Sequence, residues 1–290
     1  MAQITAQLVK ELREITGAGM MECKKALEAA EGDIENAIDV LRTRGLASIA
    51  KKAGRATNEG LLVAAVAEDG QSAALAEVNC ETDFVSRNEI FQNYADQVAK
   101  AVLTHDPADI EALMAVSTEN QTIAEMIAEA IFKIGENIQI SRFQRLTVES
   151  GLIASYIHAG GRLGVLVSLK LDKPENANNS DVKALAKDLA MQVAAANPGA
   201  VSRADFAPEL IEREMAIYKA QAAESGKNED IQTKMAEGRL EKFYRETALI
   251  EQGFIKDPDK TIKQVIAEVS KALGENIEVI GFERFELGQA

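Results

Sequence analysis

One short stretch of the sequence combines a thiol, several acids and a large apolar ring. Residues 77–87 read Glu-Val-Asn-Cys-Glu-Thr-Asp-Phe-Val-Ser-Arg. They follow an apolar run that predicts a buried strand and precede a helical pattern beginning near Asn88, so we expect them on a strand-to-helix loop. Asp83 beside Phe84 would then form a wedge for a partner. The alternative is that Phe84 folds back into the core while Thr82 or Asp83 caps the next helix.

The same stretch offers a second chemistry, with Cys80 as a nucleophile, His158 as its base and Asp83 as the group that orients the base. Against it, Cys80 ends an apolar strand, where cysteine is usually a small buried hydrophobe. His158 ends another strand beside a glycine turn, where it could face a partner or cap the hairpin. No phosphate-binding, zinc-protease or nucleophile-elbow motif is present. We therefore predict a non-enzyme with no catalytic residue, no metal site and no cofactor.

Composition and charge restrict the class of ligand. The 290 residues include 32 basic and 46 acidic side chains, for a net charge of -14, which argues against direct binding of nucleic acid. No apolar span is long enough for a membrane helix, and the N-terminus has no signal or transit composition. Two cysteines, Cys23 and Cys80, indicate neither a disulfide framework nor a zinc site. We expect a globular cytoplasmic protein with a protein or small-molecule partner.

The first segment, residues 1–53, shows three helical patterns. Residues 16–19, which include Gly17, separate the first two patterns, and Gly32 ends the second. Asp33 is placed to cap the third helix, which we expect to end at Gly45. Residues 57–60 read as a linker.

The loop before the second helix presents two methionines, Met20 and Met21. Methionine offers an adaptable contact surface, and one of two adjacent helix positions usually faces outward. The alternative is that both side chains belong to the small core.

The rest of the chain contains an internal repeat. Residues 60–79 predict a strand, a tight turn and a second strand, and residues 151–171 repeat that plan 91 positions later. Each unit ends with a related sequence, at 134–143 and at 273–285, that predicts the end of a helix, a glycine that stops it and a strand. The sequence therefore predicts an α+β protein with a duplicated core of antiparallel hairpins and helices.

The second unit carries an insertion. Two helical patterns, at 208–225 and 230–247, flank a polar turn and predict an antiparallel helical hairpin. Its seam has coiled-coil spacing, with Ile231 and Met235 placed to pack opposite Ile211, Met215, Tyr218 and Ala222. We expect it to project from the second unit; the alternative is that it lies flat on its own domain. The predicted domains are 1–53, 54–146 and 147–290, with the insertion at about 200–247.

Two long motifs in matching order resemble the signatures of the elongation factor Ts family, the guanine-nucleotide exchange factors of translation elongation in bacteria and organelles. They are residues 12–27 (Leu-Arg-Glu-Ile-Thr-Gly-Ala-Gly-Met-Met-Glu-Cys-Lys-Lys-Ala-Leu) and residues 77–85. The resemblance covers nearly the whole chain. It implies that the three helices are a ubiquitin-associated-like (UBA-like) domain and that the insertion is a coiled coil. Family members often continue past a closing strand, here at 282–287, into a C-terminal helix that contacts the partner. This sequence stops at Ala290, so the resemblance does not extend to that contact.

The resemblance also implies a mechanism. In that family the Asp-Phe pair enters between helices of the G domain of elongation factor Tu and shifts the elements that hold Mg²⁺ and the phosphates, so that GDP leaves. A partner that binds the nucleotide-free state more tightly must weaken GDP binding by the same factor, and no catalytic base is needed. The positions that match family contacts with the partner are Thr82, Asp83, Phe84, Val85, Met20, Met21, Lys24 and His158.

Two questions stay open from the sequence. The first is a rival function, a non-catalytic adaptor whose N-terminal three-helix domain binds a ubiquitin-like or ribosomal partner. The second is stoichiometry, because the sequence does not settle whether two copies associate to give a heterotetramer with two copies of each factor.

Overall fold

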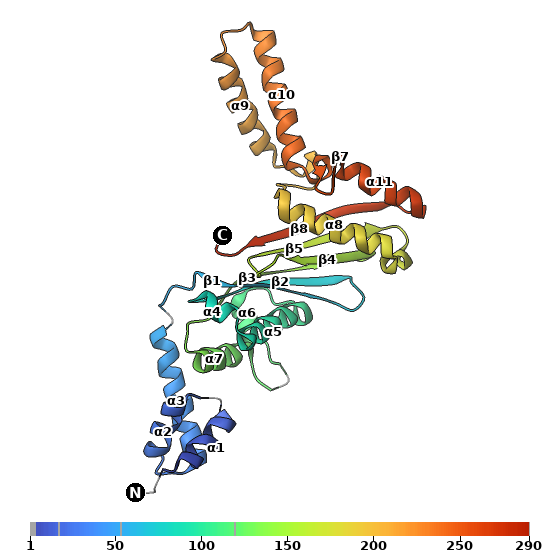
Figure 1. Ribbon diagram of the computed structural model, residues 1–290. Coiled ribbons are helices and arrows are strands. Elements are labelled where there is room, and N and C mark those ends of the chain that lie inside the picture. Colours follow the sequence, from blue (N-terminus) through green and yellow to red (C-terminus); the bar gives the residue numbers. More distant parts are fainter. Residues whose placement is uncertain (1–3, 17, 53, 119, 290) are drawn as a thin grey trace.

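The computed structural model describes residues 4–16, 18–52, 54–118 and 120–289 (Figure 1). Helices and antiparallel strands are mixed, as expected for an α+β protein. Three helices lie at one end of an elongated molecule, two sheets with their helices form the middle, and a pair of helices projects from the other end. Gly17, expected between the first two helices, and the predicted boundary at residue 53 lie outside the described residues.

The N-terminal helices are α1 (Ala6–Thr16), α2 (Met20–Ala29) and α3 (Ile34–Lys52). Their small core includes Leu12, Cys23 and Leu27. Asp33 caps α3 as predicted, since its Oδ1 accepts a hydrogen bond from the Asn36 amide at 2.7 Å. The prediction that α3 ends at Gly45 is wrong: the helix continues to Lys52. A glycine inside a helix costs only about 1 kcal/mol relative to alanine, which does not by itself end the helix.

The first sheet has the order β1-β2-β3, with all neighbours antiparallel. Its strands are β1 (Glu59–Val66), β2 (Ser72–Cys80) and β3 (Gln139–Thr147). Residues 59 and 60, which the sequence placed in a linker, already belong to β1. The helices of this unit are α4 (Asp83–Ser86), α5 (Glu89–His105), α6 (Ile110–Ala115) and α7 (Ile123–Ile134).

The second sheet, in the order β4-β5-β8, repeats the first. Its strands are β4 (Gly151–Ile157), β5 (Leu163–Leu171) and β8 (Ile277–Glu286), packed with α8 (Ser180–Ala196) and α11 (Ile262–Leu273). The register shifts at equivalent places in both sheets, between residues 77 and 78 and between 168 and 169. The predicted repeat is therefore confirmed. Smaller elements are η1 (Pro174–Asn178), η2 (Arg203–Asp205), η3 (Leu249–Glu251), β6 (Gly253–Phe254) and β7 (Asp257–Thr261).

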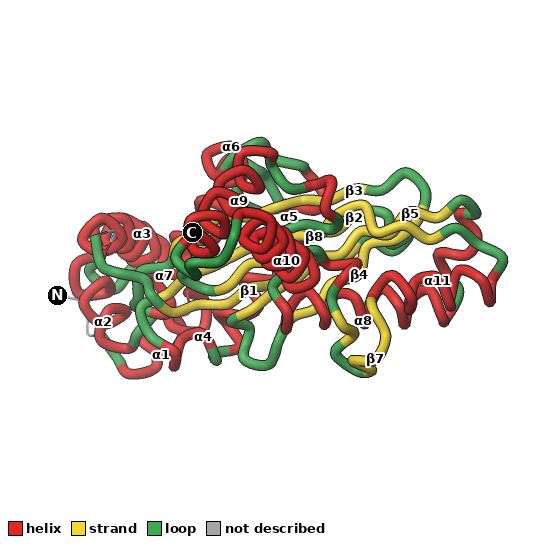
Figure 2. Tube along the Cα trace, turned by 90° about the horizontal axis from the view of Figure 1, so that it is seen from above, coloured by secondary structure: helices red, strands yellow, loops and turns green. Residues whose placement is uncertain are grey.

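The two sheets share a core and are joined by a reciprocal pair of hydrogen bonds. The Leu62 amide donates to the Gly161 carbonyl at 2.7 Å, and the Ile153 amide donates to the Gly70 carbonyl at 2.7 Å. Both pairs of equivalent positions are 91 residues apart, so the contact has approximate two-fold symmetry. The strands of both sheets cross the middle of the molecule in Figure 2. The shared cluster comprises Leu62, Ala73, Leu75, Val148, Ile153, Leu166 and Phe285.

A buried ion pair fastens the last strand to the first sheet. Glu77 is only 2% exposed, and its Oε2 accepts from Arg142 Nε at 2.8 Å. Arg142 also donates to the Glu286 carbonyl at 2.8 Å and lies over the Phe285 ring. The second oxygen of Glu77 accepts from the Gly288 amide at 3.1 Å. The paired charge and its hydrogen bonds offset the cost of burying Glu77.

The insertion forms the predicted pair of helices, α9 (Pro208–Ala223) and α10 (Glu229–Thr247), which project from the second unit rather than lying flat on it (Figure 1). Ala222 and Ala236 are the fully buried residues of the pair, and Met215 and Met235 are half-buried. Ile231 is 42% exposed, so it is not buried between the two helices. Two helices alone cover only a narrow strip of each other, and larger side chains at its edge stay in contact with water.

No helix in the described part of the chain has both the length and the apolar character needed to cross a membrane. Among those same residues, no group of three or more histidine, cysteine, aspartate or glutamate side chains could hold a metal ion.

Candidate partner-binding site

Phe84 lies on α4, a helix of four residues directly after β2. Thr82 caps this turn, since the Val85 amide donates to its hydroxyl at 3.4 Å. The Phe84 side chain is 80% exposed, whereas Val85 packs against the core of the first sheet. The alternative in which Phe84 folds into the core is therefore wrong, although Thr82 does cap a helix. Within this turn Phe84 takes the outward position and Val85 the inward one.

A carboxylate from a distant part of the chain holds this loop. Glu136 follows α7, and one of its oxygens accepts from the amides of Glu81 and Thr82, both at 3.0 Å. Its other oxygen accepts from the Thr82 hydroxyl at 2.6 Å. Hydrogen bonds to a charged group are shorter and stronger than neutral ones. The loop that presents Phe84 is thus anchored at its first two residues.

A second set of polar contacts joins the loop to the segment that leaves α3. The Glu81 carboxylate accepts from the Asn137 amide at 2.7 Å and from Arg55 at 3.3 Å. The Asn137 side chain in turn donates to the Arg55 carbonyl at 2.9 Å. These bonds connect the loop with the chain segment between the N-terminal helices and β1.

Asp83 is half-exposed and pairs with Arg87 at 3.0 Å, one helical turn further along. The backbone carbonyl of Asp83 accepts from the Ser86 hydroxyl at 2.9 Å. Near this turn, Ile90 at the start of α5 is 48% exposed. The site therefore presents an exposed ring with a partly neutralised acid beside it.

The structure does not bring together the groups of the covalent alternative. Cys80 is fully buried, and its thiol donates to the Thr82 carbonyl at 3.2 Å. Burial, with a smaller contribution from the nearby Glu136 carboxylate, raises the pKa of the Cys80 thiol to about 12. His158 instead contacts the Tyr156 hydroxyl through Nδ1 at 2.9 Å, and Asp83 pairs with Arg87. A thiol that keeps its proton at neutral pH is a poor nucleophile.

The remaining predicted contact residues lie in two other places. Met20 and Met21 at the start of α2 are 45% and 63% exposed, so neither belongs to the core. Lys24, one turn later, is exposed and pairs weakly with Glu28 at 3.9 Å. His158 is exposed in the turn between β4 and β5, where its amide donates to the Leu163 carbonyl. The structure therefore separates the predicted contacts into α4, the start of α2 and the β4–β5 turn.

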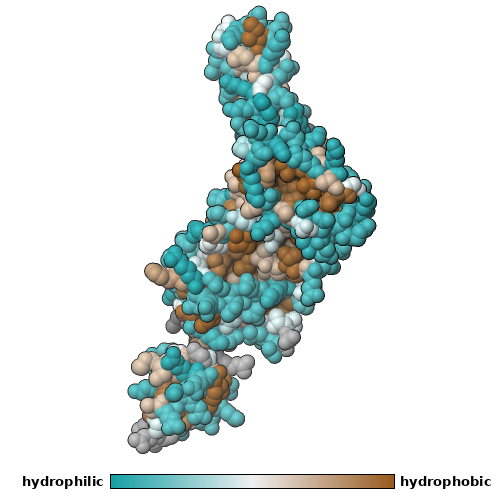
Figure 3. All heavy atoms as spheres, turned by 45° about the vertical axis from the view of Figure 1, so that its right-hand side comes forward, coloured by the Kyte–Doolittle hydropathy of each residue, from teal (hydrophilic) through white to brown (hydrophobic). Residues whose placement is uncertain are grey.

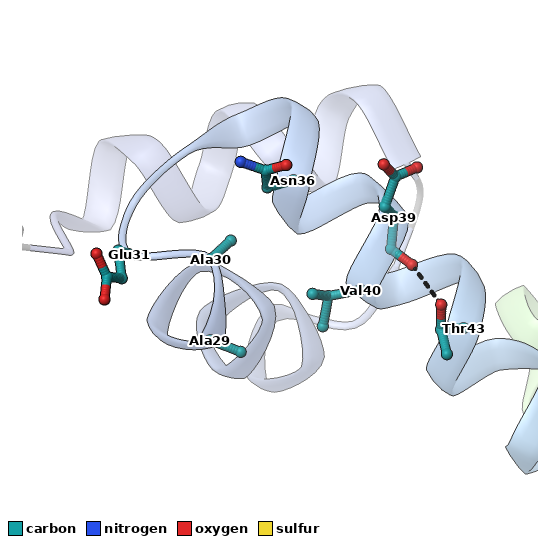
Figure 4. A pocket seen from close by; sticks show the side chains of 7 residues that line it. All are labelled: Ala29, Ala30, Glu31, Asn36, Asp39, Val40 and Thr43. Atoms are coloured by element: carbon teal, nitrogen blue, oxygen red, sulfur yellow. Dashed lines mark hydrogen bonds between the residues drawn. The ribbon is translucent and has the colours of Figure 1, made fainter.

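Surface character differs along the molecule. On the face drawn in Figure 3, apolar residues gather over the two-sheet middle, while the projecting helical pair is mainly hydrophilic. A shallow groove, not singled out from the sequence, lies between the end of α2 and the first half of α3 (Figure 4). Its lining residues are Ala29, Ala30, Glu31, Asn36, Asp39, Val40 and Thr43.

Sequence reasoning missed Glu136 and Asn137 as parts of this site. The signal was present, because Gly-Glu-Asn occurs at 135–137 and again at 274–276 in the phrases that close the two units. Glu275 makes the equivalent contacts, accepting from the amides of Asp172 and Lys173 at 2.9 and 3.1 Å. Burial alone would raise the pKa of Glu275, but hydrogen bonds from Asn176 and from the backbone amides outweigh it and lower the pKa. The repeated phrase thus encodes a repeated anchor.

Comparison with known proteins gives a consistent result over the whole chain. A family model described as Elongation factor TS matches residues 81–289. The chain is 49% identical over 289 residues to the Elongation factor Ts of Desulfovibrio desulfuricans, which covers 99% of each chain. It is 48% identical over 290 residues to that of Clostridium novyi and 46% identical over 289 residues to that of Trichlorobacter lovleyi. Each of these two matches covers 99% of this chain and 93% of the relative.

Proposed function

The chain belongs to the elongation factor Ts family of translation elongation factors, and from this membership we propose that it binds elongation factor Tu and releases its GDP. The exchange factor acts by linkage rather than by covalent chemistry. It binds the nucleotide-free state of its partner more tightly than the GDP-bound state, so each ligand weakens the other by the same factor. GTP then loads onto the emptied site. This chain needs no catalytic group, metal or cofactor of its own for that task.

The Asp83-Phe84 pair is the wedge in this proposal. It enters between helices of the partner's G domain and displaces the elements that hold Mg²⁺ and the phosphates. The observation that carries the proposal is the 80% exposure of Phe84 on a turn anchored by Glu136. An anchored ring loses little conformational freedom on insertion, so more of its burial energy is available to displace those elements. Thr82 and Val85 flank the ring and complete this contact.

Two further contacts support the wedge. The exposed Met20 and Met21, with Lys24, engage the G domain from a UBA-like N-terminal domain, residues 1–53, and His158 approaches the same partner from the β4–β5 turn. The core units are residues 54–146 and 147–290, and α9 with α10 forms a short coiled coil. We place the action in the cytoplasm, without membrane or direct nucleic-acid contact. In this proposal two copies of each factor can associate as a heterotetramer.

Release of fluorescent mant-GDP from purified elongation factor Tu tests the wedge. Phe84→Ala is expected to slow stimulated release at least about tenfold, because truncating a central aromatic contact commonly costs about 2 kcal/mol or more. Its own stability should change little, since the ring is mostly in water. Ile255→Ala is the matched control: Ile255 is 42% exposed at the β6–β7 turn, away from the site.

A folded Phe84→Ala variant that releases mant-GDP as fast as the wild type would refute the wedge. If the wild type itself does not stimulate mant-GDP release, the adaptor hypothesis is favoured, in which the N-terminal helices bind a ubiquitin-like or ribosomal partner.

A further inference from the structure

The helix that carries Phe84 is too short to hold its own geometry. Four residues make little more than one turn, and the first amides of a helix have no partner within it. Isolated helices of this length are not stable in water. The direction of the Phe84 ring must therefore be set by contacts from outside α4.

Glu136 supplies the polar contacts at the start of the turn, in addition to the packing of Val85 against the core. It stands directly after Gly135, whose left-handed backbone (φ 91°) ends α7 and turns the chain toward the loop. Its three hydrogen bonds fix the Glu81 amide, the Thr82 amide and the Thr82 hydroxyl. Because that hydroxyl donates to Glu136, its lone pairs remain available to the Val85 amide, which closes α4. One carboxylate thus sets both the position of the loop and the cap of the turn.

We propose that Glu136 is the positioning residue for Phe84, and that its carboxylate holds the ring in the direction that GDP release requires. This rests on the proposed function, in which Phe84 is the wedge. Glu136 itself need not touch the partner. It acts through Thr82, whose amide and hydroxyl connect it to the residue next to Asp83.

The duplication provides a comparison within the same molecule. Glu275 accepts from the amides of Asp172 and Lys173 and, at 2.6 Å, from the Asn176 side chain. Residues 172 and 173 lie 91 positions after 81 and 82, so the two carboxylates anchor equivalent loops. The second loop leads into η1 and presents no large apolar side chain among the exposed ones. The same kind of carboxylate anchor therefore occurs twice in the molecule, once beside an exposed aromatic ring and once without one.

The test compares Glu136→Gln with Glu275→Gln. A glutamine offers one acceptor oxygen where the carboxylate offers two, and its amino group would face a donor, so both variants lose the same kind of anchor. The chain has no tryptophan, so Phe84→Trp gives a single fluorescent reporter at the ring position. Time-resolved anisotropy of that reporter measures ring mobility in the free protein. Mant-GDP release is measured separately, in variants that keep Phe84. Thermal unfolding is recorded for every variant.

We expect Glu136→Gln to increase the mobility of the reporter and to slow GDP release about tenfold, the effect of losing one or two charge-assisted hydrogen bonds. Glu275→Gln should lower the unfolding temperature similarly and leave mobility and release as in the wild type. Glu136→Gln combined with Phe84→Ala should be no slower than Phe84→Ala alone. If Glu136→Gln does not fold, Thr82→Val, which keeps the shape and removes the hydroxyl, should give the same direction of change in both measurements.

Three results would overturn the inference: unchanged reporter mobility in Glu136→Gln, unchanged GDP release despite a mobile reporter, or equal slowing by Glu136→Gln and Glu275→Gln. A Phe84→Ala variant that releases mant-GDP at the wild-type rate is a different outcome. It would remove the wedge itself, and the mobility measurement would still decide whether Glu136 orients the ring.

Discussion

Phe84 and Cys80 lie four positions apart and occupy opposite environments. The aromatic ring is mostly in water, whereas the thiol is fully buried and donates to the Thr82 carbonyl. Solvation decides the chemistry of each. The ring can exchange water for a partner, and the thiol keeps its proton because an anion would be poorly solvated in its place.

The raised pKa of Cys80 predicts slow alkylation. With a pKa of about 12, only about one thiol in ten thousand is ionised at pH 8, so native Cys80 should react with iodoacetamide far more slowly than after unfolding in guanidinium. Mass spectrometry of the peptide containing residue 80 measures this directly. Fast native labelling of Cys80 would contradict the prediction.

The same shift predicts how stability depends on pH. The thiol binds its proton more tightly in the folded chain than in the unfolded chain, so its contribution to stability is fully present below the ordinary thiol pKa of 9.0 and is lost as pH rises toward about 12. In Cys80→Ala, urea unfolding between pH 8 and pH 10.5 should show a weaker decline than in the wild type. Cys23→Ala, which removes the other buried cysteine, is the control.

Among the elements, the helical pair α9–α10 stands on a small polar and aromatic base. Arg203 pairs with Glu251, at 2.5 Å, and with Glu241 of α10, at 2.7 Å, while its guanidinium lies 4.6 Å from the centre of the Tyr244 ring. Phe206 and Phe243 pack beside that ring. One arginine thus joins η2, η3 and α10, and we expect it to hold the direction in which the pair leaves the second unit.

Replacing Arg203 should loosen the pair without unfolding the core. In Arg203→Met, spin labels at Ser225 and on the second sheet should give a broader distance distribution, while the unfolding temperature changes by only a few degrees, because exposed ion pairs are individually weak. Arg203 lowers the pKa of Glu241, so the contribution of their bond is complete above the usual glutamate pKa and is lost as pH falls through the lowered pKa. Arg245→Met on the same helix is the control. Equally broad distance distributions in Arg203→Met and Arg245→Met would argue against a specific role of Arg203.

Elements with a long, regular pattern could be predicted from the sequence, and those set by distant contacts could not. The four hairpin strands, the closing strands and the inserted helices follow from apolar spacing and turn residues. By contrast, α4 has too few residues to show a period, and the direction of Phe84 depends on Glu136, far along the chain. The end of α3 was missed because a glycine permits a helix as well as a stop. Exposure of both Met20 and Met21 also exceeded what helical spacing alone indicates.

For the whole molecule, the two sheets behave as halves of one folding unit in our interpretation. Leu75 and Leu166 occupy equivalent positions, both are fully buried, and both contribute to the core that the sheets share. Their side chains therefore stabilise the partner sheet as well as their own.

Leu75→Ala and Leu166→Ala should each lower the free energy of unfolding by about 3 kcal/mol. Hydrogen exchange should show reduced amide protection in both sheets for either variant. Leu189→Ala, which affects the separate core between α8 and the second sheet, should reduce protection there more than in the first sheet. Loss of protection limited to the mutated sheet would show that the halves open independently.

The ion pair between Glu77 and Arg142 has a consequence for biosynthesis. Glu77 is made early, yet two of the groups that complete its surroundings come late in the chain: the Glu286 carbonyl bound by Arg142, at the end of β8, and the Gly288 amide just after it. A nascent chain in which β8 is unfinished or still inside the exit tunnel lacks them. The first sheet can thus assemble during synthesis and pair Glu77 with Arg142, but the hydrogen bonds around this ion pair stay incomplete until β8 and Gly288 leave the exit tunnel.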